Sequence, residues 1–188
     1  MNLWDKLFSI ASSCPNGMLN LTGLTQKGKG TYSRYFILPD GRGVKMLRTL
    51  PIWWNTIDGG LKLGDDRLLK QMKEATKEYA IYKQAEKSGV TPKVYSAELV
   101  CFENHYYAAI IMEHIEGEVF ENRRFKRRYT MSVHAKIEYI LKKKLRSVGV
   151  EHNDLHIANV ITRIEGKRKR SFAIDFTPQY VNLKEEAV

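Results

Sequence analysis

The chain has 188 residues, of which 43% are hydrophobic and 28% charged, a composition that suits one globular domain with its own core and excludes a disordered chain. No apolar run reaches the roughly 18 to 20 residues that a membrane span needs, and the N-terminus is too polar for a secretory signal. The two cysteines, Cys14 and Cys101, form neither a metal-ligand spacing nor a disulfide framework, so we expect a reducing, cytoplasmic environment.

The formal net charge of +10 favours an acidic partner, which could be nucleic acid, an anionic membrane surface or an acidic protein. Part of this charge lies in three basic runs, at residues 123–128, 142–146 and 167–170. A solvated surface is the commoner role of such runs, and the sequence has no nucleic-acid-binding motif to accompany them. We therefore expect no specific nucleic-acid partner, and the role of the basic runs stays open.

In chain order, residues 1–17 predict a short amphipathic helix, an N-terminal extension that packs on the domain; a membrane or targeting role is the alternative. The next segment predicts a three-stranded antiparallel meander. Its strands are expected at residues 18–24, 32–38 and 44–47, and its turns at residues 26–31 and 39–43.

After an irregular stretch at residues 49–66, apolar residues spaced by three and four predict a helix over residues 67–88, which Gly89 ends. Residues 94–102 and 106–112 predict two more strands, which makes a five-stranded antiparallel sheet with one helix. The remaining elements are a second helix over residues 134–148 and a hairpin at residues 160–164 and 171–174.

Gly28, Lys29 and Gly30 form a glycine-rich loop early in the chain. Glycines between strands let backbone amides approach phosphate oxygens without a Cβ clash. A hairpin turn is the commoner reason for such glycines, and the loop has neither the ending of a Walker loop nor the following helix of a dinucleotide fold. Alone, the loop is a weak candidate for a phosphate cradle.

Lys45 lies between Val44 and Met46 in an otherwise apolar strand. On the buried side of a sheet, a lysine needs an anionic partner. That partner could be nucleotide phosphates together with a glutamate of the next helix, with Glu78 the first candidate and Glu74, one turn earlier, the second. The alternative is a lysine on the solvent face of an edge strand.

Asp154, Asn159 and Asp175 form the sharpest pattern, with the second five positions after the first and a hairpin before the third. An acid, a carboxamide and a second acid in this order are typical of a phosphoryl-transfer site, where one group orients the attacking hydroxyl and two hold magnesium. An unrelated set of polar loop residues is the alternative, which the glycine loop and Lys45 upstream disfavour.

With these motifs in this order, the chain resembles the protein kinase-like superfamily over nearly its whole length. The resemblance implies an α+β, bilobal fold in a single domain over residues 1–188. It implies an N-lobe at residues 18–112, with a five-stranded antiparallel sheet and one helix, and a strongly reduced helical C-lobe at residues 113–188.

The resemblance also assigns roles to the candidate residues. Lys45 would bind the α- and β-phosphates of ATP and pair with Glu78, and Asp154 would act as the catalytic base. Asn159 and Asp175 would hold Mg²⁺ through hard oxygen donors. The other nucleotide-binding residues are implied in the glycine loop and in a hinge whose backbone holds adenine: Gly28, Lys29, Gly30, Glu113 and Ile115.

Three positions depart from the usual protein-kinase pattern. Asn153 replaces the arginine before the catalytic aspartate, which indicates independence from a phosphorylated activation loop. Thr177 replaces the glycine of Asp-Phe-Gly, which should restrict backbone flipping there. His156 replaces the usual lysine, as in small-molecule and atypical kinases. Beside the base, His152 is expected to be structural.

The chain ends soon after Asp175, so we expect neither the protein-substrate platform of a full C-lobe nor the helical insertion of small-molecule kinases. In this it resembles minimal kinases that bacterial type III secretion delivers into host cytoplasm, most of all the effector family that phosphorylates the ninety-kilodalton heat-shock chaperone of eukaryotes. The resemblance implies a monomeric serine/threonine kinase that uses ATP and Mg²⁺ on a host protein, with an acidic activating partner as a further expectation. A small-molecule kinase and a non-catalytic pseudokinase are the alternatives.

Overall fold

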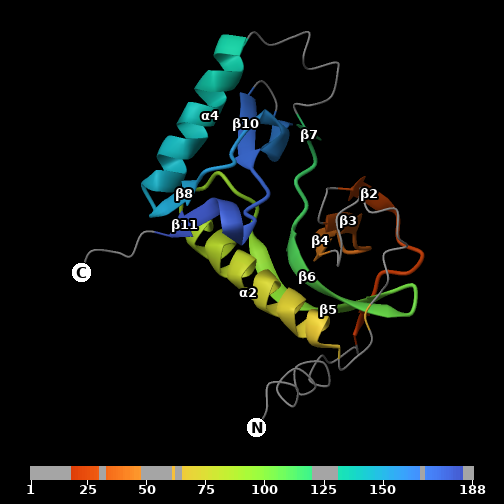
Figure 1. Cartoon of the computed structure of the whole chain (residues 1–188). Helices are drawn as coiled ribbons and strands as arrows, with labels where there is room; N and C mark the ends of the chain where they lie inside the picture. Colours follow the sequence, from red (N-terminus) through yellow and green to blue (C-terminus); the bar gives the residue numbers. More distant parts are fainter. Residues whose placement is uncertain are drawn as a thin grey trace. The chain divides into compact units, whose positions relative to one another are not determined.

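A computed structural model of the chain describes residues 18–29, 33–47, 61, 65–119, 131–165 and 168–183. The helix expected at residues 1–17 and the basic run at residues 123–128 lie outside these ranges, as does most of the irregular stretch. The fold is mixed α+β, and the chain divides into two compact units (Figure 1). The first unit consists of Met1–Tyr79 and Val94–Glu113, and the second of Ala80–Lys93 and His114–Val188.

The first unit contains a six-stranded sheet with the strand order β1-β5-β6-β4-β3-β2. Its strands are β1 (Leu19–Asn20), β2 (Gln26–Lys29), β3 (Ser33–Ile37), β4 (Arg42–Leu47), β5 (Val94–Phe102) and β6 (His105–Glu113). The meander β2-β3-β4 and the hairpin β5-β6 are antiparallel. At the tip of the β5-β6 hairpin, Glu103 and Asn104 have φ values of +50° and +63°, in the left-handed region that such tight turns require.

The expectation of five antiparallel strands is wrong, because β1, within the first expected strand, is not antiparallel to its neighbour and β2 adds a sixth strand. β1 runs parallel to β5, with Leu19 opposite Val100. The segment expected as one long strand at residues 18–24 turns soon after Leu21, and Gly23 in that turn has a φ of +83°. A weak alternation of apolar residues therefore marked a two-residue strand followed by a turn.

The turn expected at residues 26–31 is also wrong in its first part, because Gln26–Lys29 is the edge strand β2. Its register against β3 shifts between Gln26 and Gly28, and Gly28 then lies opposite Tyr35. A glycine in a strand often marks such an irregularity. The irregular edge strand lacks the period-2 pattern by which strands are predicted.

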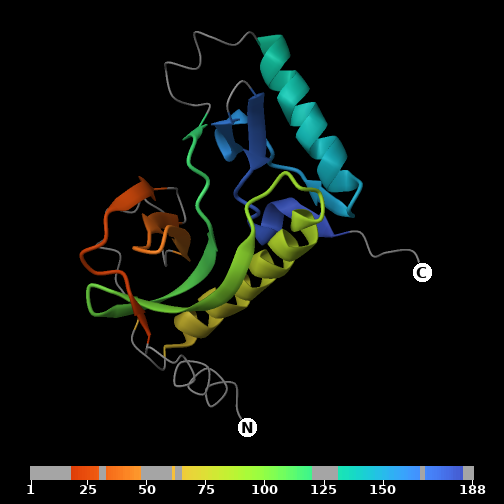
Figure 2. The same cartoon turned by 180° about the vertical axis from the view of Figure 1, so that it is seen from behind.

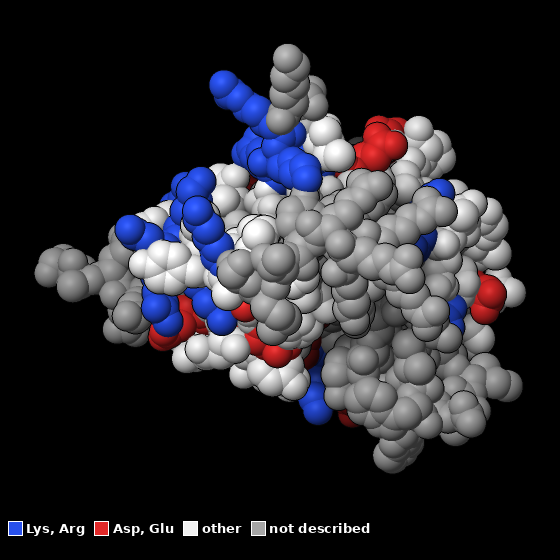
Figure 3. Space-filling model, turned by 90° about the horizontal axis from the view of Figure 1, so that it is seen from above, with Lys and Arg blue, Asp and Glu red and all other residues white. Residues whose placement is uncertain are grey.

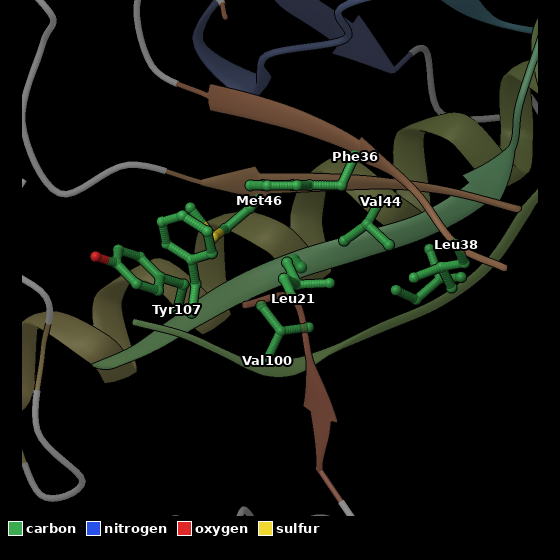
Figure 4. Packing of buried hydrophobic residues seen from close by; sticks show 10 residues of the cluster. Leu21, Phe36, Leu38, Val44, Met46, Val100 and Tyr107 are labelled. Atoms are coloured by element: carbon green, nitrogen blue, oxygen red, sulfur yellow. The ribbon is translucent and has the colours of Figure 1, made fainter. Parts of the chain in front are cut away.

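One face of this sheet carries the hydrophobic core of the first unit (Figure 4). Residues from the four strands β3 to β6 and from the β1-β2 and β3-β4 turns meet there, and each is at most 8% exposed. They are Leu21, Phe36, Leu38, Val44, Met46, Val100, Phe102, Tyr107, Ala109 and Ile111. Because successive side chains of a strand point to opposite faces, Val44 and Met46 enter this core and Lys45 between them does not.

Helix α2 (Asp66–Glu86) confirms the helix expected at residues 67–88. Asp65 begins it, since its Oδ1 accepts the N–H of Arg67 at 2.9 Å, as an N-cap residue does. Gly89 ends it with a φ of +70°, in the left-handed conformation that a helix C-terminus favours. The described residues contain no helix that is long and apolar enough to cross a membrane.

The second unit contains helix α4 (Met131–Arg146) and two small sheets. α4 and the β9-β10 hairpin confirm the second helix and the last hairpin expected from the sequence, and α4 lies beside β10 in both views (Figures 1 and 2). The sequence did not indicate β7, β8 or β11. The strands are β7 (Glu118–Val119), β9 (Val160–Glu165) and β10 (Arg168–Ala173) in one sheet, and β8 (Val150–His152) and β11 (Val181–Leu183) in the other.

Candidate active site

Lys45 makes a buried ion pair within the first unit. Its Nζ lies 2.6 Å from Oε1 of Glu78 on α2, and the two side chains are only 11% and 3% exposed. Lys45 therefore does not face solvent, and its partner is the first of the two glutamates that the sequence left open. Glu74, the second, is more exposed and lies 3.6 Å from Lys77.

Burial of this ion pair adds little to the stability of the fold. Removing two charges from water costs several kcal/mol per ion, and their mutual attraction does little more than offset that cost. A buried ion pair is therefore a weak source of net stability. Lys45 nevertheless lies on an interior strand, between the fully buried Val44 and Met46.

The glycine loop is described only in part. Gly28 lies in β2, while Gly30 and the side chain of Lys29 lie outside the described residues. Gly28 is not among the glycines with a positive φ, and an added Cβ would reach only van der Waals distance, 3.4 Å, from Cβ of Tyr35. A tight turn therefore does not explain this glycine, and a phosphate cradle stays a prediction.

Tyr35, which the sequence did not single out, covers the backbone next to Lys45. The two residues lie opposite each other on β3 and β4, and a Cβ on Gly43 would overlap the tyrosine ring. Burial, with a smaller effect from the charge of Glu113, raises the pKa of Tyr35 to about 12. The phenol therefore stays neutral, and its place opposite Lys45 follows from the β3-β4 register, which the sequence did not show.

The predicted hinge coincides with the boundary between the units along the chain. Glu113 is the last residue of β6 and of the first unit, and His114 begins the next part of the second unit. Ile115 is 4% exposed, so its side chain is part of a core. The binding of adenine by the backbone of this segment stays a prediction.

In the second unit, the β9-β10 hairpin brings Asn159 and Asp175 together. Val160, which follows Asn159, pairs with Ala173. One residue further, the N–H of Ile174 donates to the carbonyl of Asn159 at 2.9 Å. The carboxamide and the second acid therefore flank the open end of one hairpin, where their spacing in the sequence placed them.

Asp154 lies in the loop before the short 3₁₀ helix Ile157–Asn159. Nδ2 of Asn159 donates to the carbonyl of Asp154 at 3.0 Å, a bond that uses the amide nitrogen and not the amide oxygen. Nδ1 of His156 accepts the N–H of Ala158 at 3.2 Å, so the neutral ring carries its proton on Nε2. That nitrogen lies 3.8 Å from Oδ1 of Asp154.

Asp175 is held by two hydroxyl groups. Its φ of +64° is in the left-handed region, which costs a residue other than glycine on the order of 1 kcal/mol or more. Its N–H donates to Oη of Tyr82 at 3.0 Å, and Oγ1 of Thr177 donates to its Oδ1, also at 3.0 Å. Tyr82 is one of the apolar residues whose spacing predicts the helix over residues 67–88, but no pattern in the sequence showed what its hydroxyl contacts.

Phe176 lies between two aromatic side chains of the same unit. Its ring centroid is 4.6 Å from that of Tyr82 and 4.8 Å from that of His152. Burial lowers the pKa of His152, and the backbone of Ile174 and the charge of Asp175 oppose that shift only in part. His152 is thus a buried neutral residue, as the structural role expected of it requires.

Two residues of the second unit carry the oxygen donors that Mg²⁺ prefers. The carboxylate of Asp175 and the amide oxygen of Asn159 are hard oxygen donors, and Mg²⁺ takes one or two such protein ligands together with water and substrate phosphates. Within the described ranges, no three His, Cys, Asp or Glu side chains gather as metal ligands. That Asn159 and Asp175 hold Mg²⁺ stays a prediction.

Comparison with solved structures shows similarity to WbdD. A co-crystal structure of WbdD with the kinase inhibitor LY294002 has a TM-score of 0.53 and 17% sequence identity, covering 82% of this chain and 32% of that chain. A 2.2 Å crystal structure of WbdD has a TM-score of 0.56 and 16% identity, covering 86% and 34%. The chain spans about a third of the length of these WbdD chains, with which it shares a kinase-like fold. No protein-family model and no curated protein sequence matches the chain.

Proposed function

We propose that the chain is a phosphotransferase that uses ATP and Mg²⁺ and acts on a protein hydroxyl. The observation that carries the proposal is the buried pair of Lys45 and Glu78. A glutamate that holds a lysine on an interior strand can orient the ammonium group toward phosphate oxygens. Such a role would explain why this ion pair is buried although it adds little net stability. The kinase-like fold supports the same function.

The residues of the second unit supply the other roles in the proposed reaction. Asp154 accepts the proton of the attacking hydroxyl as the new phosphorus–oxygen bond forms and the bond to the ADP leaving group breaks. Nδ2 of Asn159 donates to the carbonyl of Asp154, and this bond fixes the side-chain amide. The amide oxygen of Asn159 and the carboxylate of Asp175 are the proposed metal donors. Magnesium, when bound, neutralises phosphate charge.

The resemblance in sequence supports a finer assignment of the substrate. It favours a serine or threonine of a host protein such as a molecular chaperone, with the chain delivered into host cytoplasm by type III secretion. These points extend the proposal beyond the kinase-like fold. Labelling of purified chaperone, alone and within a cell lysate, tests them.

The surface of the second unit favours an acidic partner. α4 and the neighbouring β10 together carry eight lysines and arginines and a single acidic residue, Glu138. Figure 3 shows these basic side chains gathered over the two elements. Such a surface attracts an acidic protein segment, which could belong to the substrate or to an activator.

The direct test is transfer from γ-labelled ATP with Mg²⁺ to proteins of a eukaryotic lysate, with Asp175→Ala as the matched control. We expect labelled protein only with the unchanged chain. His156 favours a small-molecule kinase as the second candidate, so a metabolite panel runs in parallel. Transfer only to a metabolite would replace the protein substrate, and nucleotide binding without any transfer would show a pseudokinase.

A second variant tests the role of the proposed base. Asp154→Asn should lower turnover by about 100-fold or more and leave the affinity for ATP nearly unchanged, because the base acts on the hydroxyl and not on the nucleotide. Loss of ATP affinity with intact turnover would show that the role belongs to another residue.

A further inference from the structure

We propose that Tyr82 and Thr177 are positioning residues that hold Asp175 in the conformation in which its carboxylate serves as a metal donor. The inference rests on the proposed function for the identity of the metal. It rests on the structure for the two hydroxyl contacts. Both contacts lie within the second unit, and neither residue is itself a proposed ligand.

The first contact holds the backbone of Asp175. A φ of +64° is a conformation that a residue other than glycine seldom adopts, so neighbouring contacts must maintain it. The N–H of Asp175 donates to the hydroxyl of Tyr82 at 3.0 Å, and the N–H of Ile174 donates to Asn159 at 2.9 Å. The amide groups of two successive peptides, Ala173–Ile174 and Ile174–Asp175, are therefore fixed immediately before the Cα of Asp175.

The packing of the Tyr82 ring does not explain why this residue carries a hydroxyl group. The side chain is 1% exposed, and the ring contact with Phe176 would be the same for a phenylalanine. A buried hydroxyl needs a hydrogen-bond partner, and the N–H of Asp175 is one that the hydroxyl of Tyr82 has. The oxygen therefore serves to direct this peptide and adds nothing to the apolar packing.

The second contact holds the carboxylate. Thr177 occupies the N-cap position of the 3₁₀ helix Pro178–Tyr180, where a threonine hydroxyl commonly accepts a backbone N–H. Its hydroxyl makes no such cap and instead donates to Oδ1 of Asp175 at 3.0 Å. The bond restricts rotation of the carboxylate, so the residue that replaces a glycine in this motif contributes an orienting group.

The two contacts predict a specific functional pattern. Residues that orient a metal ligand alter metal affinity when they are changed, commonly by about 10- to 100-fold. Neither is a proposed nucleotide ligand, so the affinity for ATP without magnesium should stay the same. A merely structural role would instead lower stability and weaken both kinds of binding together.

The variants separate the hydroxyl groups from the bulk of the side chains. Tyr82→Phe keeps the ring on Phe176 and removes one oxygen. Thr177→Val keeps the branched shape and removes the hydroxyl, while Thr177→Ser keeps the hydroxyl and serves as the matched rescue. Urea unfolding of each variant checks that the fold is retained.

Two measurements are made on the full chain. Hydrogen exchange without nucleotide reports the amide of Asp175, which should exchange about tenfold faster in Tyr82→Phe, the factor expected for one lost hydrogen bond. Binding of a fluorescent ATP analogue, titrated with Mg²⁺, should require about tenfold more metal in Tyr82→Phe and Thr177→Val. Thr177→Ser should behave as the unchanged chain does.

The results distinguish this inference from the proposed function. Unchanged exchange and unchanged metal dependence in both hydroxyl-deleted variants would overturn the inference while leaving the function intact. If Mg²⁺ does not raise the nucleotide affinity of the unchanged chain, the proposed function is wrong, and the metal-orienting role with it. Equal loss of binding in Thr177→Ser and Thr177→Val would also overturn the role of the hydroxyl.

Discussion

Breaking the pair of Lys45 and Glu78 should destabilise the chain by an amount that depends on which residue is changed. Lys45→Met leaves a carboxylate that is 3% exposed, and Glu78→Gln leaves an ammonium group that is 11% exposed. Removal of one partner of a buried ion pair costs about 3 to 5 kcal/mol, so each single variant should lose that much at pH 7. The double variant should lose less than the sum, because it leaves no charge buried.

The stability deficits of the two single variants should respond differently to a fall in pH. In Lys45→Met the carboxyl of Glu78 can escape its buried charge by taking up a proton. At a pH above the ordinary glutamate pKa of roughly 4.3, this protonation costs about 1.36 kcal/mol of stability per pH unit, which sets an upper limit on the deficit. That limit is about 3.7 kcal/mol at pH 7 and about 1 kcal/mol at pH 5. A carboxyl that holds its proton more tightly in the folded than in the unfolded state adds stability as pH falls.

The deficit of Lys45→Met should therefore shrink by up to about 2.7 kcal/mol between pH 7 and pH 5. Glu78→Gln should show no such recovery, because a buried lysine escapes its charge by losing a proton and acid opposes that loss.

Urea unfolding followed by circular dichroism at both pH values measures these effects. Glu74→Gln is the matched control: its contact with Lys77 is exposed, so the change should be within about 0.5 kcal/mol. Two results would refute the burial of this pair. One is a stability loss in the double variant equal to the sum of the single losses, and the other is a loss in Lys45→Met that does not change with pH.

Three further predictions concern the second unit. Because burial lowers the pKa of His152, the unfolded chain takes up that proton more readily than the folded one, so stability should fall as pH drops through about 6.5; thermal midpoints of His152→Gln should lose this part of the pH profile, and an identical profile would contradict it. Gly117→Ala would place Cβ 2.7 Å from both Cγ2 of Ile161 and the carbonyl oxygen of Thr162, which should cost about 1 to 3 kcal/mol in urea unfolding; an unchanged midpoint would show that this backbone yields. Lys143→Glu on α4 should weaken capture of an acidic protein at low salt without changing the thermal midpoint, and equal capture would place the partner elsewhere.

The elements that the sequence predicted correctly are those with strong local signals. α2 and α4 have apolar residues spaced by three and four, and glycines with positive φ end the turns that follow them, at Gly89 and Gly149. The β5-β6 hairpin has long runs of strand-forming residues around a short turn. In each case the deciding contacts lie within a few residues of one another, so the local pattern contains them.

The elements that the sequence missed depend on distant partners. The strand expected at residues 18–24 is reduced to the two residues of β1, and its parallel pairing with β5, about eighty positions along the chain, was not indicated. β8 and β11 are three residues each and stabilise one another, with Val181 opposite His152. Segments this short have no periodicity to read, and only the pairing defines them.

The sequence by itself determined the types and order of the candidate site residues: a lysine within an apolar strand, and an acid, a carboxamide and a second acid around a hairpin. The tertiary structure decided their partners. It paired Lys45 with Glu78, 33 positions away, and directed the hydroxyl of Tyr82 to the backbone of Asp175, 93 positions away. The sequence specifies which chemical groups are present, but a hydrogen bond between distant residues exists only where folding brings two particular atoms within about 3 Å.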